Sequence, residues 1–334
     1  MRSRRMSVDP LAYSYPHGGA RVKHWIVIAA LAAVAPGPAA AQRAGAASVQ
    51  VRMGHVDFHV DSSVVLRIHS LRGALLRSSP EHPPYLDDKN SFSLAIDSAR
   101  IGLTPASLSD LLNHYTFAYR GSPLRKLTIT IEDGHLKQHG LMKGISFTVV
   151  GDLTVTPDGE LRLHPSSIKA VGIGVGGLMK FFGLSLQKMM NTSGARGVRI
   201  EGNDLLLSPA ELLPPPKVQG RLVAIEVSDT ELVQVFGARP ESVAHPHVPP
   251  EPKAPNYMLF RGGELRFGKL TMTDTDLLIV DAEPKDRFDF SLDHYNEQLV
   301  AGYDRNTPDH GLIVTMPDFA TLAPGRRLPA PAVR

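Results

Sequence analysis

The stretch that decides the fold is HVDFHVDSSVVLRIH, residues 55–69. Its even positions from Val56 to Ile68 are mainly apolar, and its odd positions are mainly polar or charged. Such alternation is typical of a β-strand that buries one face and exposes the other. The pattern predicts one unusually long strand over 56–68, about 43 Å from end to end at the usual rise per residue.

The same period of two recurs along most of the chain. Before the opening stretch the alternation runs in the opposite phase, and Gly54 at the reversal predicts a bulge or kink. Further strands and hairpins are predicted over 92–96, 127–131, 145–163, 198–207, 217–236, 257–280 and 312–316.

Few helices are expected. Thr104 and Pro105 form an N-cap and first-turn pair that predicts a short helix. Another helix is expected through 292–300. The segment 177–190, GLMKFFGLSLQKMM, predicts a helix with an apolar face so wide that it must be buried or bind an apolar ligand.

Together these elements predict an α+β fold. We expect a long, strongly curved, mostly antiparallel sheet wrapped around one long apolar helix as a half-barrel, plus a C-terminal β-rich extension. The interior of such a half-barrel is suited to acyl chains. The predicted lipid-binding residues are Val56, Phe58, Val60, Phe147, Val149, Leu178, Phe181, Phe182, Leu186, Met189 and Met190.

The N-terminal residues predict export. Residues 1–41 combine basic residues, an 11-residue apolar run at 25–35 and a small-residue cleavage site at 39–41, as in a signal peptide. They hold five of the 36 basic and one of the 33 acidic residues, so the remainder has 31 basic and 32 acidic residues, a net charge of −1. No basic field is left to favour nucleic acid. We expect a periplasmic or otherwise extracytoplasmic protein, soluble after cleavage or associated with the membrane.

The amino-acid composition along the chain predicts the domain boundaries. We expect a lipid-binding-like domain over 42–237, a proline-rich linker over 238–255, a β-rich region with one helix over 256–319 and a disordered tail over 320–334. The chain has no cysteine, so burial alone must stabilise the domains.

Two motifs suggest other chemistry. His55, Asp57, His59 and Asp61 alternate on one strand face, and a metal-dependent envelope hydrolase using His55, Asp57 and His59 is one alternative. Their spacing of about 6.6 Å along a strand is too wide for all four to bind one ion unaided.

GIGVGG at 172–177 matches a dinucleotide-binding pattern, but hairpins surround it, so no cofactor is expected. No other catalytic constellation is found.

Residues 127–236 resemble bacterial members of the tubular lipid-binding (TULIP) superfamily, in particular the LmeA-like phospholipid-binding group. The similar segments are TPDGELRLHP at 156–165, GVRIEGNDLLLSP at 197–209 and PPPKVQGRL at 214–222. The resemblance implies a curved sheet around a helix, with phospholipid or another acyl-chain ligand between them and no catalytic residue. A further alternative is a non-catalytic envelope interaction module that docks a protein partner through 257–316.

Overall fold

The hairpin of β1 (Val49–His59) and β2 (Val65–Arg77) is central to the larger sheet of the computed structural model. The predicted single strand over 56–68 is wrong, because the chain reverses between Val60 and Val64. The Asp61 carboxylate stabilises this turn by accepting hydrogen bonds from the backbone N–H groups of Ser63 and Val64. The structure describes residues 48–170, 195–237, 252–323 and 327–329.

The turn keeps the two arms of the hairpin in phase. Val56 pairs with Ile68 and Phe58 pairs with Leu66, so even positions lie opposite even positions. Side chains of paired residues share a face of the sheet. The apolar positions of both strands therefore lie on one side, and the alternation continues through the turn as it would in a single strand.

The larger sheet has eleven strands and is mostly antiparallel. Three of its pairs are parallel, namely β10–β3, β1–β17 and β16–β19. In spatial order its main path is β11 (Arg221–Val227), β12 (Leu232–Gly237), β3 (Phe92–Leu103), β2, β1, β13 (Tyr257–Arg261), β16 (Asp276–Asp281), β19 (Leu312–Met316) and β18 (Tyr303–Asn306), with β10 (Lys217–Gln219) beside β3 and β17 (Phe288–Ser291) beside β1.

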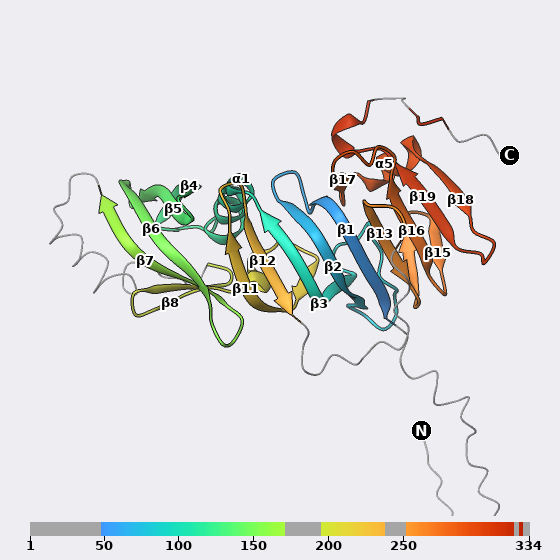
Figure 1. Cartoon of the computed structure of the whole chain (residues 1–334). Helices are drawn as coiled ribbons and strands as arrows, with labels where there is room; N and C mark the ends of the chain where they lie inside the picture. The colour runs from blue at the N-terminus through green and yellow to red at the C-terminus, as the bar shows by residue number, and fades with distance from the viewer. Residues whose placement is uncertain (1–47, 171–194, 238–251, 324–326, 330–334) are drawn as a thin grey trace, which may run out of the picture. The chain divides into compact units, whose positions relative to one another are not determined.

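Strands from both sides of the proline-rich segment meet at β1 (Figure 1). β13 pairs with β1 from Gln50 to Gly54, and β17 pairs with it from Val56 to His59. Between these two partners His55 has a φ of 51°, in the left-handed region. The expected reversal of phase thus lies at the residue after Gly54, where β1 changes its partner.

The second sheet follows the helical segment that begins at Thr104. The Thr104 side chain accepts a hydrogen bond from Ser107 N–H and caps α1 (Pro105–Leu111), which confirms the predicted short helix. A π-helical turn over Leu112–Thr116 continues it. The six strands of this sheet are, in spatial order, β4 (Leu124–Glu132), β5 (His135–Met142), β6 (Ile145–Val155), β7 (Leu161–Ala170), β9 (Asp204–Leu207) and β8 (Val198–Glu201).

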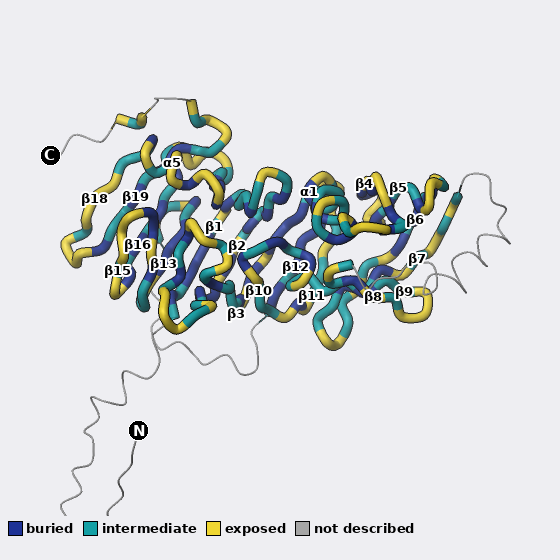
Figure 2. The backbone as a smooth tube through the Cα atoms, turned by 180° about the vertical axis from the view of Figure 1, so that it is seen from behind, coloured by how far each residue is buried: buried dark blue, intermediate teal, exposed yellow. Residues whose placement is uncertain are grey.

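The remaining elements are short. The predicted helix over 292–300 is α5 (Tyr295–Ala301), and α4 (Pro209–Leu212) follows β9. β14 (Leu265–Phe267) and β15 (Leu270–Met272) form a separate hairpin, and a 3₁₀ turn covers Phe319–Thr321. Figure 2 shows buried residues concentrated in the strands and exposed ones in the turns.

The predicted fold class needs a correction. The longest helical stretch of the described residues runs from Pro105 to Thr116, and no long apolar helix with a sheet wrapped around it is seen there. The apolar segment 177–190, on which that prediction rested, lies outside the described residues. In the described part of the chain, no helix has the length and apolar character needed to cross a bilayer. Strands that bury one face against other strands and short helices form the core instead.

Candidate functional site

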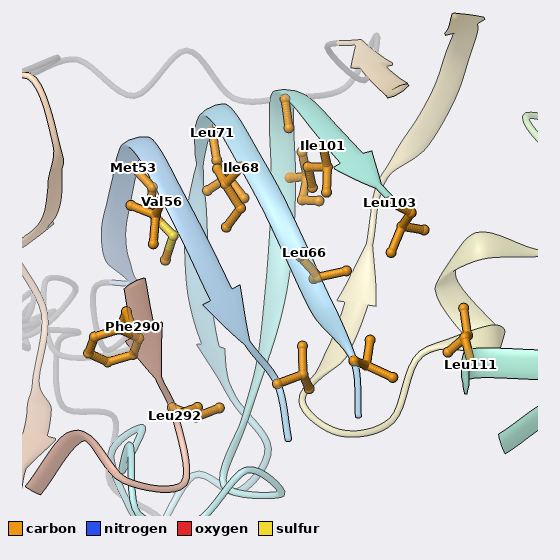
Figure 3. Packing of buried hydrophobic residues seen from close by; sticks show 14 of the residues in the cluster. Met53, Val56, Leu66, Ile68, Leu71, Ile101, Leu103, Leu111, Phe290 and Leu292 are labelled. Carbon is orange, nitrogen blue, oxygen red and sulfur yellow. The ribbon is translucent and has the colours of Figure 1, made fainter. Parts of the chain in front are cut away.

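A first apolar cavity lies on one side of the larger sheet. β1 and β2 line it with even positions near their turn (Phe58, Leu66 and Ile68) and with odd positions beyond the reversal of phase (Met53, Leu71 and Leu75). β1, β2, β3, β12, β13 and β17 contribute side chains, and the segment after α4 lines part of it. Figure 3 shows Met53, Ile68, Leu71 and Phe290 of this lining. The cavity has about 890 Å³ of atom-free space, open solvent at its mouth included. Of the 23 described residues that line it, only Gln234 is polar.

A second apolar cavity lies between the helical segment 105–116 and the second sheet. It is lined by residues of α1, β4 to β7, β9 and α4, and by β12 of the larger sheet. Its atom-free space is about 730 Å³, again with open solvent included. Gln138 and Gln234 are the polar residues among the 18 described ones that line it.

The two cavities adjoin. Pro209, Leu213 and Gln234 line both of them. Pro209 begins α4 and Leu213 follows it, so this short helix and β12 form the boundary between the cavities. No charged side chain of the described residues lines either cavity. An apolar ligand can therefore contact both spaces without meeting a buried charge.

The structure places the predicted lipid-binding residues unevenly. Phe58 and Val60 line the first cavity. Val56 is fully buried but does not contribute to either lining, and the same holds for the buried Phe147 and Val149 of β6. The other predicted residues, which are Leu178, Phe181, Phe182, Leu186, Met189 and Met190, lie outside the described residues, as does the glycine motif at 172–177.

Most of the lining was not predicted from the sequence. β3, β12, β13 and the segment 208–218 supply residues such as Ile96, Phe236 and Phe260. Their alternation marks them as strand residues with a buried face, but not as neighbours of β1 and β2. The sequence signal for Gln234 is its place inside the apolar run LVQVF of β12.

The predicted metal residues contact different partners. Asp57 Oδ1 is 2.5 Å from Arg287 Nε and 3.8 Å from Arg67 Nε. His59 Nε2 lies 2.5 Å from Asp289 Oδ1, while His55 is exposed. The fourth residue, Asp61, accepts hydrogen bonds in the hairpin turn. Across the described ranges, no three His, Cys, Asp or Glu side chains lie close enough together to hold a metal ion.

These ion pairs belong to the polar side of the larger sheet. Asp57 and Arg67 pair across β1 and β2 at odd positions, so their side chains point away from the first cavity. His69 follows Arg67 at the next odd position of β2, and its Nε2 lies 2.9 Å from Glu231 Oε1. The alternation of side chains along the strands thus places the charged groups on one face of the sheet and the apolar lining of the cavity on the other.

Comparison of the chain with protein-family models, with curated proteins and with solved structures gives no match.

Proposed function

We propose that this protein binds an acyl-chain lipid in the two adjoining cavities. The observation that carries the proposal is the composition of the lining, which is apolar apart from two uncharged glutamines. Each methylene group removed from water contributes about 0.8 kcal/mol, so a chain of ten methylenes gains roughly 8 kcal/mol before the entropic costs of binding. Met53 and Met258 suit such a ligand, because their flexible side chains adapt to different chain shapes.

The region 257–316 is part of this site in the proposal. Met258, Phe260 and Phe290 line the first cavity beside Phe58, and β13 and β17 extend the sheet on the free side of β1. This arrangement favours a contribution to ligand binding over a role as a separate docking module. The dispersed contacts of Asp57 and His59 give the hydrolase alternative no support.

The proposed place of action is outside the cytoplasm, as a lipid carrier of the bacterial envelope. Its support is the signal-peptide pattern of residues 1–41 and the resemblance of 127–236 to phospholipid-binding proteins. Native mass spectrometry of protein exported by a bacterial host tests location and ligand together. We expect a chain that begins at Gln42 and carries bound phospholipid or fatty acid. Lipid-free protein that also fails to take up a fluorescent fatty acid would contradict the proposal.

A substitution at the boundary of the cavities tests the site. Leu213→Trp adds a large ring beside Pro209 and Gln234, and we expect it to weaken binding of cis-parinaric acid about tenfold or more. Leu270→Trp is the matched control, because Leu270 is 47% exposed on β15 and lines neither cavity. Circular dichroism checks that both variants fold. Equal affinity in the two variants would place the ligand elsewhere.

A further inference from the structure

Two buried glutamines in the apolar cavities have side chains without a hydrogen-bond partner among the described residues. Gln138 is 7% exposed and Gln234 is 9% exposed. Gln138 lines the second cavity, and Gln234 lines both cavities where they adjoin. Their backbones pair in β5 and β12, which fixes the positions of the two amides within the sheets.

Among the described residues, the other buried side-chain amides are those of Gln298 and Asn256, and both are hydrogen-bonded. Gln298 accepts a hydrogen bond from Ser291 N–H and donates to the carbonyl oxygens of Asp289 and Pro317. Asn256 donates to the Asp281 carboxylate and to a backbone carbonyl. The amide atoms of Gln138 and Gln234 are not among the fully buried unpaired polar atoms of the described residues, so they remain accessible from the cavities that they line. Because they are accessible and have no protein partner in the described part of the chain, the two cavity glutamines are candidates for contacts with a ligand.

We propose that Gln234, assisted by Gln138, donates a hydrogen bond to the carbonyl oxygen of an ester- or amide-linked acyl chain. The inference rests on the proposed function and specifies which part of the lipid is recognised. A side-chain NH₂ group donates two hydrogen bonds, and an ester carbonyl accepts them without bringing charge into the cavity. An alkyl ether lacks that carbonyl oxygen.

The lining also indicates what is not recognised in the cavities. A phosphate group is bound in proteins by arginine, lysine or several backbone N–H groups. The described lining contains no cationic side chain. A charged headgroup is therefore expected to stay outside the apolar space. The protein should select the chemistry of the acyl linkage and tolerate changes of headgroup.

The test compares a diester with a diether phosphatidylglycerol that has the same chain length. Competition of each lipid with cis-parinaric acid gives the two affinities. We expect the wild type to bind the diester about three- to tenfold more tightly, which is the usual contribution of one hydrogen bond. Diester phosphatidylcholine should bind within about twofold of the phosphatidylglycerol, because the headgroup stays outside.

Variants assign the preference to the glutamines. Gln234→Met should remove most of the preference for the diester while leaving diether binding unchanged or tighter. Gln219→Met is the matched control, because Gln219 lines neither cavity and donates to Ser93 Oγ at 3.2 Å. Equal binding of both lipids to the wild type, or a preference that survives in Gln234→Met/Gln138→Met, overturns the inference but leaves lipid binding intact. No binding of either lipid would instead contradict the proposed function.

Discussion

At the scale of single residues, the buried glutamines differ more in their surroundings than in their burial. Gln298 is fully buried and makes three hydrogen bonds, whereas Gln234 is almost as buried and its amide faces apolar side chains. A buried amide that loses water without gaining a partner costs about 1–3 kcal/mol. The Gln234 amide atoms are not among the fully buried unpaired atoms of the described residues, so we expect the cost in the free protein to lie at the lower end of that range.

Gln234→Met should therefore raise the free energy of unfolding of the lipid-free protein by about 1 kcal/mol. Gln298→Met should lower it by about 2 kcal/mol or more, because the N–H of Ser291 and two carbonyl oxygens lose their partner. Urea denaturation of delipidated protein measures both changes. A Gln234→Met variant that is less stable than the wild type would mean that this amide is already paired.

At the scale of elements, β17 and the 3₁₀ turn at 319–321 are joined through two carboxylates. Asp318 Oδ1 accepts a hydrogen bond from Asp289 N–H at 2.8 Å, and Asp289 Oδ2 accepts one from Ala320 N–H at 2.9 Å. Burial raises the pKa of Asp318 to about 6. Burial also acts to raise the pKa of Asp289, but the hydrogen bonds from His59 and Ala320 outweigh it and the net pKa is lowered.

The raised pKa of Asp318 has a defined effect on stability. Between its ordinary value of 3.8 and about 6, the folded state binds more protons than the unfolded state, so this group destabilises the fold progressively as pH rises. Asp318→Asn keeps an oxygen acceptor for Asp289 N–H. We expect the variant to be about 1–2 kcal/mol more stable than the wild type at pH 7.5, after allowance for partial solvent screening.

The gain from Asp318→Asn should disappear near pH 3.5, where the wild-type carboxyl is protonated. Thermal unfolding at the two pH values measures the difference. Asp133→Asn serves as a control for the general effect of removing one charge, because Asp133 is exposed in the turn after β4 and asparagine tolerates its positive φ of 53°. A stabilisation that is equal at both pH values would argue against an elevated pKa in the folded protein.

At the scale of the whole molecule, the strands after residue 256 complete the sheet begun by residue 49. Deleting residues 238–334 removes β13 and β17 from β1 and takes Met258, Phe260 and Phe290 out of the first cavity. The new edge of β1 would expose unpaired backbone groups beside apolar side chains, a combination that promotes aggregation. A chain that ends at Gly237 should therefore be aggregated and unable to take up cis-parinaric acid.

Size-exclusion chromatography and the uptake assay check the deletion. The matched control ends at Leu328, whose N–H donates to Ala301 O, and it retains all described strands. We expect the control to remain monodisperse and to bind the fatty acid. Full binding by a monodisperse 1–237 chain would show that the C-terminal strands are dispensable for the site.

The sequence by itself determined that the chain is mostly strands, which face of the predicted strands is apolar, and where short features such as the Thr104 cap and the α5 helix lie. These depend on periodicity and on contacts between near neighbours. It did not predict the strands β5, β17 and β18. The sequence did not reveal the turn at 61–63. Even-numbered residues of β1 pair with even-numbered residues of β2, so the alternation of apolar and polar residues continues across the turn without a break. Only the tertiary structure decided that Met53, Gln234 and Phe290 line one space. Their strands are held in the sheet by pairings between residues up to 232 positions apart, and such partners are not encoded by local alternation.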